Sequence, residues 1–198
     1  NKRLRTHEIH NRKRKGTGLK IGILTKNSEA YCTTQLQGAL RKSDNEPICF
    51  SFRHLLARMD GRPAVESRLL DVMDLSAIIV RPIGTGSLDE IIFRIDVLHR
   101  LERLGLPIFN GPSAIEKAVD KYNALCIIEE EGYPVPKTAV TEDWEEALRA
   151  FRELGGDVVV KPLFGSRGMG SARISDPDTA TRVFKILAQF HQVCYVQE

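Results

Sequence analysis

The sequence predicts an α/β protein in two parts, an N-terminal parallel-sheet domain and a smaller α+β unit that follows it. Strand-like and helix-like patterns alternate in the first half of the 198 residues. Such alternation is typical of a parallel sheet with helices on both faces. A turn cluster, Asn110-Gly111-Pro112, then marks a boundary. Further on, a glycine-rich segment lies between two strand-like runs, which is typical of an antiparallel pair.

The parallel-sheet domain is predicted over residues 19–110, after a leader of residues 1–18. Short apolar, often β-branched runs indicate its strands, at 20–24, 47–52, 77–80 and 107–109. Apolar residues at helical spacing predict a helix near 34–41 and a longer one that ends near Gly105. The longer helix has an apolar stripe made of Leu88, Ile91, Ile92, Ile95 and Leu98. Asp89 and Glu90 form no evident acid–base pair and favour the N-terminus of this helix.

The second unit is predicted over residues 111–198. Ser113 to Glu116 has the Ser-x-x-Glu pattern of a capping box and predicts one helix that continues to Gly132. Asp143 and Asp176 mark two further helix starts. Strand-like runs lie at 137–140, 158–161, 172–174 and 193–197.

Composition indicates a cytoplasmic protein without a membrane segment. Hydrophobic residues make up 42% of the chain, but no apolar run approaches the ~20 residues that span a bilayer. The start lacks the pattern of a signal peptide. The four cysteines are scattered without a C-x-x-C pair, which favours reduced, mostly buried thiols over a disulfide framework or a zinc site. The five histidines show no metal-ligand spacing.

Positive charge is concentrated at the N-terminus. Residues 1–18 hold seven Lys and Arg against one acid, so the net charge of +3 divides into +6 for the leader and −3 for the rest. A basic leader can contact nucleic acid through phosphates, but this one has no aromatic residues for base stacking. We favour a solvated, flexible leader over a nucleic-acid arm, and expect neither nucleic acid nor membrane as a partner.

The segment Val158–Ser171, VVVKPLFGSRGMGS, carries the clearest chemical signal. A β-branched run ends in Lys161, where a hydrophobic residue would cost less free energy. Gly165, Gly168 and Gly170 can turn backbone N–H groups toward an anion. Their spacing matches neither the dinucleotide pattern nor a P-loop. The residues alone leave two interpretations: a phosphate-holding loop between two antiparallel strands, or a surface hairpin with Lys161 in solvent.

Five motifs lie in order along the chain: Asn110–Ile115, Asp120-Lys121, Gly132–Thr138, Val160-Lys161-Pro162 with Gly165–Gly170, and Tyr195–Glu198. In this order they resemble the ATP-grasp superfamily, and within it the RimK-like amino acid ligases, many of which attach glutamate to a carboxylate acceptor. The resemblance covers residues 20–198. It implies a pre-ATP-grasp α/β domain, then a small ATP-grasp lobe, with ATP held between that lobe and a C-terminal lobe.

The resemblance also implies roles for residues at the matching positions. Lys121 and Lys161 would reach the nucleotide phosphates, Glu198 would mark the hinge at the adenine edge, and Arg81 would approach substrate. The loop over the phosphates would consist of Gly165, Ser166, Arg167, Gly168, Met169 and Gly170. Arg167 is the one candidate catalytic residue, since it could follow the transferring phosphoryl group. The residues themselves equally allow a solvated Lys121, an Arg81 paired with an acid, and an exposed loop cation at Arg167.

The implied reaction phosphorylates a carboxylate with ATP, and an amine then attacks the acyl phosphate to form an amide. The family's Mg²⁺ ligands belong to the C-terminal lobe, beyond Glu198. We therefore expect no metal ligand, no ligase activity and weak ATP binding from this chain alone.

The sequence leaves open the acceptor, the oligomeric state and one alternative function. A ribosomal protein tail, a pterin coenzyme, an amino-group carrier and a peptide all fit as acceptor. Homo-oligomerisation is an expectation of the family only. The alternative function is a non-catalytic nucleotide- or partner-binding module that uses the basic leader.

Overall fold

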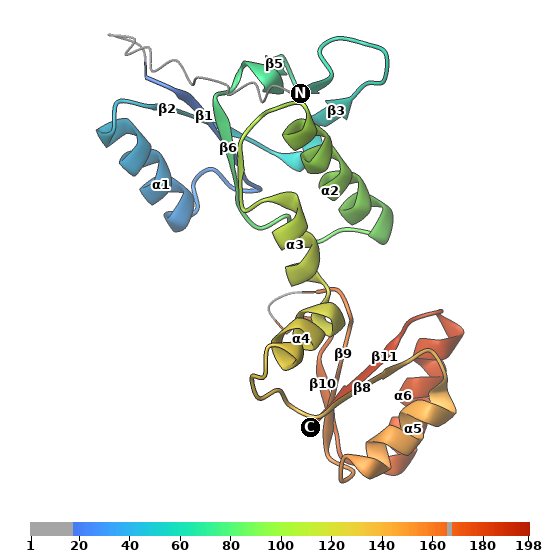
Figure 1. Cartoon of the computed structure of the whole chain (residues 1–198). Coiled ribbons are helices and arrows are strands. Elements are labelled where there is room, and N and C mark those ends of the chain that lie inside the picture. The colour runs from blue at the N-terminus through green and yellow to red at the C-terminus, as the bar shows by residue number, and fades with distance from the viewer. Residues whose placement is uncertain (1–17, 166–167) are drawn as a thin grey trace, which may run out of the picture. The chain divides into compact units, whose positions relative to one another are not determined.

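The computed structural model describes residues 18–165 and 168–198, which form two compact units (Figure 1). Unit 1 contains the described residues up to Ile83 together with Arg100–Phe109, and unit 2 contains Gly84–His99 and Asn110–Glu198. The domain boundaries drawn from the sequence, including the leader of residues 1–18, stay a prediction. None of the helices in the described ranges is both long and apolar enough to cross a membrane.

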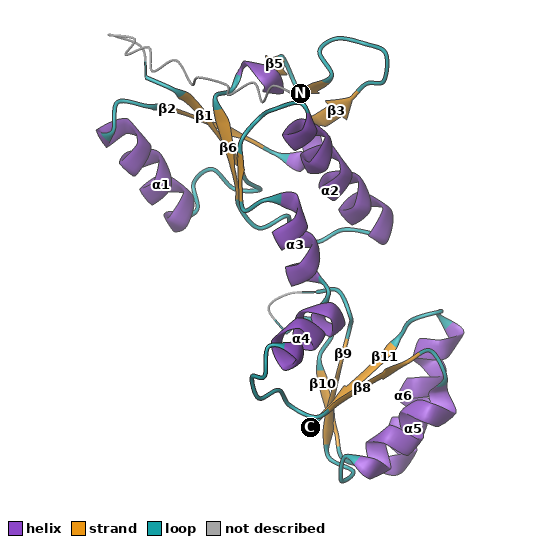
Figure 2. Ribbon diagram, in the orientation of Figure 1, coloured by secondary structure: helices purple, strands orange, loops and turns teal. Residues whose placement is uncertain are grey.

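Unit 1 contains the predicted parallel sheet, with strand order β2-β1-β6-β7. Figure 2 shows the neighbouring strands β2, β1 and β6. Its strands are β1 (Lys20–Leu24), β2 (Glu46–Phe50), β6 (Ala77–Val80) and β7 (Ile108–Phe109). Strand β1 pairs with both β2 and β6, and Ile23 and Leu24 are completely buried. Parallel neighbours need a crossover connection, and helices α1 (Tyr31–Lys42) and α2 (Leu88–Arg103) occur in the two connections that lead to β2 and β7.

Residues 52–74 form a small substructure that the sequence analysis did not predict. Three short antiparallel strands lie in the order β3-β4-β5, flanked by two 3₁₀ turns. The elements are η1 (Phe52–His54), β3 (Leu55–Ala57), β4 (Val65–Ser67), β5 (Leu70–Asp71) and η2 (Val72–Asp74). The strand predicted over 47–52 therefore ends at Phe50. Strands of two or three residues are too short to show a readable alternation of apolar and polar side chains.

Helix α2 begins with a reciprocal cap. The Ser87 N–H donates to Glu90 Oε2 at 2.9 Å, and the Glu90 N–H donates to Ser87 Oγ at 3.2 Å. This confirms that the acidic pair belongs to a helix N-terminus. The predicted apolar stripe is buried only toward its C-terminal end. Leu98 is fully buried, whereas Leu88 is 57% exposed and Ile92 is 49% exposed.

The single helix predicted from Ser113 to Gly132 is in fact two helices, α3 (Pro112–Val119) and α4 (Lys121–Glu130). Helix α3 starts after Gly111 without a side-chain cap, so the predicted capping box at Ser113 is wrong. Asp120 interrupts the helix with an extended backbone, φ −89° and ψ 109°. Its carboxylate accepts hydrogen bonds from the N–H groups of Tyr122 and Asn123. Asp120 is therefore a helix N-cap, and Lys121 becomes the first residue of α4.

Unit 2 contains an antiparallel sheet with strand order β10-β9-β11-β8. The strands are β8 (Thr138–Thr141), β9 (Val158–Lys161), β10 (Ala172–Ile174) and β11 (Cys194–Gln197). Strands β9 and β10 pair antiparallel, which confirms the predicted strand–loop–strand arrangement. Helices α5 (Trp144–Glu153) and α6 (Pro177–Gln189) begin at Asp143 and Asp176, and both carboxylates cap as predicted.

The two faces of this sheet serve different purposes, because alternate side chains of a strand point to opposite faces. One face packs against α5 and α6 in a buried core. The core residues are Ala147, Phe151, Val158, Val160, Ile174, Ala180, Phe184, Cys194 and Val196. The residues of opposite parity, Lys161, Tyr195 and Gln197, belong to the other face.

The prediction of reduced, mostly buried cysteine thiols is only partly confirmed. All four are free, but Cys32 is exposed, Cys49 and Cys126 are half-buried, and only Cys194 is buried. Burial raises the pKa of the Cys194 thiol, as expected for a core position. The prediction of mostly buried thiols is wrong, since spacing along the chain does not report solvent exposure.

Candidate functional site

Two lysines of unit 2 lie close enough for the charge of Lys161 to act on Lys121. Lys161 is the last residue of β9, and Lys121 is the first residue of α4. Partial burial lowers the pKa of Lys121, and the positive charge of Lys161 lowers it further, while Asp120 acts in the opposite direction. The structure thus brings together the two lysines that the sequence analysis assigned to phosphate binding. Their positions are 40 residues apart in the numbering, and the turn at Asp120 and the end of β9 place them.

The ammonium group of Lys121 holds the start of the glycine segment. Its Nζ donates to the carbonyl oxygens of Pro162 at 2.9 Å, Leu163 at 3.2 Å and Gly165 at 3.0 Å. A lysine ammonium has three donors, so each proton has a backbone acceptor. The alternative interpretation of Lys121 as a solvated lysine is therefore wrong, because its ammonium group is held by backbone carbonyls. The three residues that it contacts follow β9 directly, so Lys121 anchors the first part of this segment.

The ammonium group of Lys161 has a different environment. Its Nζ donates to Gln197 Oε1 at 2.5 Å and lies 5.0 Å from the centre of the Tyr195 ring, a cation–π arrangement. Tyr195 is completely buried, and this burial raises the pKa of its hydroxyl. Sequence reasoning assigned no role to Tyr195 or Gln197. Their same-parity positions on one strand were the available signal, but only the pairing with β9 shows which residue they face.

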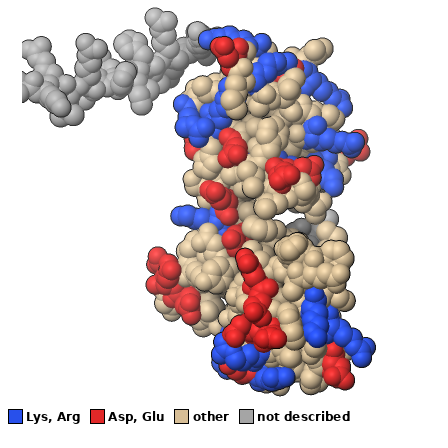
Figure 3. Space-filling view, turned by 90° about the vertical axis from the view of Figure 1, so that its right-hand side faces the viewer, with Lys and Arg blue, Asp and Glu red and all other residues tan. Residues whose placement is uncertain are grey.

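Among the described residues, the acceptors of both lysines are neutral oxygen atoms. Within residues 18–165 and 168–198, no carboxylate forms an ion pair with Lys121 or Lys161. The rest of unit 2 is acidic, with seventeen Asp and Glu against eight other Lys and Arg in its described residues. A run of acidic side chains is visible on this unit in Figure 3. Two ammonium groups that form no ion pair with a carboxylate of the described residues favour an anionic ligand at that position.

Backbone conformation favours glycine at two positions of the loop, and close neighbours favour it at a third. Gly168 and Gly170 have φ of +70° and +79°, in the left-handed region that favours glycine. At Gly165, a Cβ would lie 3.2 Å from Pro162 Cγ and 3.7 Å from Lys121 Nζ. Met169 is 58% exposed. The predicted roles of Ser166 and Arg167 lie outside the described residues.

Glu198 closes strand β11 against the segment before β8. Its N–H donates to the Lys137 carbonyl at 3.1 Å, and its Oε1 accepts from the Lys137 N–H at 3.0 Å. A looser ion pair joins Glu198 Oε2 to Lys137 Nζ at 3.6 Å. The adenine-hinge role of Glu198 stays a prediction.

Arg81 belongs to unit 1, directly after β6. Its N–H donates to the Leu24 carbonyl at 2.9 Å, and the residue is half-buried. Its predicted role in substrate binding stays a prediction, as does the alternative of a core-edge ion pair.

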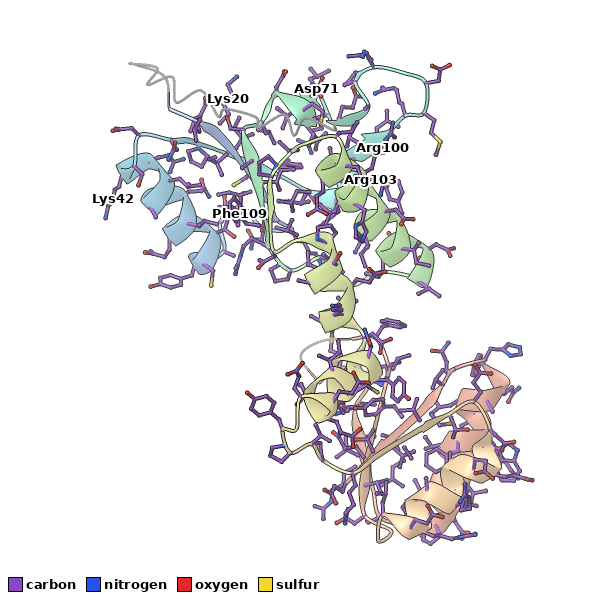
Figure 4. All side chains as sticks on the ribbon, in the orientation of Figure 1. Lys20, Lys42, Asp71, Arg100, Arg103 and Phe109 are labelled. Carbon is purple, nitrogen blue, oxygen red and sulfur yellow. The ribbon has the colours of Figure 1, made fainter. Side chains whose placement is uncertain are left out.

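Unit 1 also has two adjoining cavities of its own. Their volumes are about 670 Å³ and about 470 Å³, and both are lined by Asp60 and Leu104. Figure 4 labels three of the other lining residues, Asp71, Arg100 and Arg103. Asp71 uses its carboxylate to cap the 3₁₀ turn η2. None of the residues predicted for nucleotide or substrate binding lines these cavities.

The described residues do not supply a metal site. No group of three or more His, Cys, Asp or Glu in residues 18–165 and 168–198 lies close enough together to hold a metal ion. The described residues therefore contain no ready-made cluster of such side chains, whereas Mg²⁺ in nucleotide sites is usually held by one or two carboxylates together with the substrate phosphates.

The chain is similar in sequence to curated glutamate ligases. No family model matches the chain. It is 31% identical over 195 residues to the tetrahydromethanopterin:alpha-L-glutamate ligase of Methanosarcina acetivorans, covering 90% of this chain and 60% of the relative. It is 33% identical over 185 residues to the ligase of the same name from Methanocaldococcus jannaschii, covering 91% and 60%. The chain thus spans about 60% of the length of these relatives.

Solved structures share the fold. The RimK domain ATP-grasp protein from Sphaerobacter thermophilus matches with a TM-score of 0.71 at 20% identity, covering 90% of this chain and 63% of that one. The D-cycloserine synthetase DcsG matches with a TM-score of 0.69 at 18% identity, covering 90% and 58%. The resemblance inferred from the five motifs is confirmed. The chain has the ATP-grasp fold of RimK-domain proteins and is related in sequence to the alpha-L-glutamate ligases.

Proposed function

We propose that the protein acts as an ATP-dependent carboxylate–amine ligase that joins glutamate to an acceptor carboxylate. The observation that carries this proposal is the pair of ammonium groups, Lys121 and Lys161, whose acceptors among the described residues are all neutral oxygen atoms. On an ATP-grasp fold, such a pair is suited to a nucleotide polyphosphate. The names of the curated relatives support glutamate as the amine donor and a pterin as one class of acceptor.

The two lysines would contribute in different ways. Lys161 donates one hydrogen bond within the described chain, so its remaining N–H groups can serve phosphate oxygens. Lys121 would exchange some of its three carbonyl partners for phosphate oxygens. The N–H groups of Gly168 and Gly170, whose backbone is in the left-handed region, would add donors along the polyphosphate.

In the proposed reaction the acceptor carboxylate attacks the γ-phosphorus of ATP, giving an acyl phosphate and ADP. The amine of glutamate then attacks the acyl carbon, the amide bond forms, and inorganic phosphate leaves. The residues of this chain would bind and orient ATP and offset its negative charge. One solved relative is described as complexed with Mg and ADP. None of the roles proposed for the residues of this chain involves a metal ion.

The remaining expectations about context are part of this proposal. The partners would be ATP, a carboxylate acceptor and an amino acid, and the compartment would be the cytoplasm, where free thiols persist. Homo-oligomerisation stays a prediction.

The test uses the natural full-length protein with ATP, Mg²⁺ and glutamate. Candidate acceptors are a reduced pterin with a terminal carboxylate and a peptide that ends in glutamate. We expect one acceptor to gain a glutamate residue by mass spectrometry, with an equal amount of phosphate released. Lys161→Met should abolish both signals. ATP binding without acceptor-dependent phosphate release would refute the ligase and support the non-catalytic nucleotide-binding module instead.

A further inference from the structure

Gln197 is a buried polar residue whose amide is held on both sides. Only 8% of it is exposed, at the end of the inner strand β11. Its Cα partners are Thr138 on β8 and Val159 on β9, while Tyr195 is paired with Lys161. Directly opposed residues of antiparallel strands project to the same face. The sheet register therefore places Gln197, Thr138, Tyr195 and Lys161 together on the face opposite the hydrophobic core.

The hydrogen bonds determine which way the amide points. Thr138 Oγ1 donates its only proton to the Pro136 carbonyl at 2.9 Å, so it can only accept from a further partner. Gln197 Nε2 donates to that oxygen at 2.7 Å and lies 3.4 Å from the Tyr195 hydroxyl. The amide oxygen must then face Lys161. A flipped amide would place its N–H groups against the ammonium group, which would be repulsive.

We propose that Gln197 is a positioning residue for Lys161, holding the ammonium group over the Tyr195 ring without neutralising its charge. A carboxylate at this position would form a stronger hydrogen bond, but it would cancel the charge that an anionic ligand needs. An apolar side chain would leave the ammonium group without its acceptor. A neutral amide meets both requirements. This inference rests on the proposed function, since it explains how one of the two phosphate lysines is oriented.

The first measurement requires no nucleotide. Lys161 is labelled with an amine-selective reagent over a range of pH, and the extent of labelling is followed by mass spectrometry. Gln197→Glu should move the labelling midpoint of Lys161 upward by about one pH unit, because a carboxylate favours the charged amine. Gln197→Met should move the midpoint downward. Gln192→Glu is the matched control, since Gln192 is exposed and contacts neither lysine.

The second measurement is the ATP affinity of the natural full-length protein. Gln197→Glu should weaken binding about tenfold, because the new carboxylate pairs with Lys161 and repels the polyphosphate. Gln192→Glu should leave the affinity within about twofold, as expected for an exposed charge screened by solvent.

The outcomes separate the two proposals. If both Gln197 variants fold with the melting behaviour of the control and Lys161 labels as in the wild type, the positioning role is wrong. If the Gln197 variants do not fold, Thr138→Val provides the test, since it removes the acceptor that orients the amide. It should move the Lys161 midpoint downward, and an unchanged midpoint would overturn the proposal. A wild-type protein that does not bind ATP would contradict the proposed function, while the labelling result would still decide the role of Gln197.

Discussion

Replacing Lys121 with methionine tests both the anchoring contacts that the structure shows and the phosphate-binding role that we propose. Methionine keeps most of the side-chain length and removes the charge. Three hydrogen bonds to backbone carbonyls are lost, at 2.9, 3.2 and 3.0 Å. A hydrogen bond from a charged donor contributes about 1.5–3 kcal/mol when buried, and less where solvent competes. Lys121 is only half-buried, so we expect an anchoring loss of about 1–3 kcal/mol for residues 162–165.

The effect on ATP follows from the charge. Coulomb attraction between two unit charges 4 Å apart is about 4 kcal/mol at a protein surface with an effective dielectric constant near 20. Part of this is offset because Lys121 must first give up carbonyl partners. A net loss of about 1.5–3 kcal/mol remains, which corresponds to about 10- to 100-fold weaker ATP binding.

The assay combines calorimetric titration of ATP into the full-length protein with hydrogen exchange of the segment that follows β9. Lys117→Met is the matched control, since Lys117 is an exposed residue of α3. We expect the Lys121 variant to show weaker ATP binding and faster exchange in the nucleotide-free protein. ATP affinity equal to that of the control would refute the phosphate role. Unchanged exchange would refute the anchoring role.

Three further predictions test the loop, the core and the pH dependence. Gly165→Ala should weaken ATP binding about three- to tenfold, because the new Cβ lies 3.2 Å from Pro162 Cγ and crowding of this kind costs up to a few kcal/mol. An ATP affinity equal to that of the wild type in the same titration would contradict this prediction. Phe184→Ala should lower the free energy of unfolding by about 3–5 kcal/mol in urea, since Phe184 is completely buried in the core of unit 2; a loss under about 1 kcal/mol would show that the site collapses around the cavity. Hydrogen bonds from Thr179 lower the pKa of Asp176, so this group stabilises the fold above its unfolded pKa of about 3.9, and the contribution is lost as pH falls through the lower folded pKa. Asp176→Asn should therefore reduce the loss of unfolding free energy as pH falls below about 4. The free energy of unfolding is measured in urea at each pH, and an equal loss in both proteins would argue against this prediction.

Local sequence patterns predicted much of unit 2 because caps and strands depend on near neighbours. Asp143 and Asp176 each cap a helix within three residues, and the β9–β10 pair forms around a glycine turn. The same kind of pattern misplaced the cap at Ser113. Ser113 is not a cap because α3 already begins after Gly111, with Pro112 in its first turn. The same Ser-x-x-Glu pattern does form a capping box at Ser87 and Glu90, at the start of α2.

The sequence by itself determined the α/β class and the positions of the main strands along the chain, and its five motifs pointed to Lys121, Lys161 and the glycine segment. Only the tertiary structure decided what those lysines contact. Lys121 reaches Gly165 across 44 positions of the chain, and Lys161 reaches Gln197 across 36. Contacts at such separations depend on strand register and on the helix break at Asp120, and no local spacing encodes them. For this reason Lys161 was predicted from its motif, whereas the amide that orients it appeared only once β9 and β11 were paired.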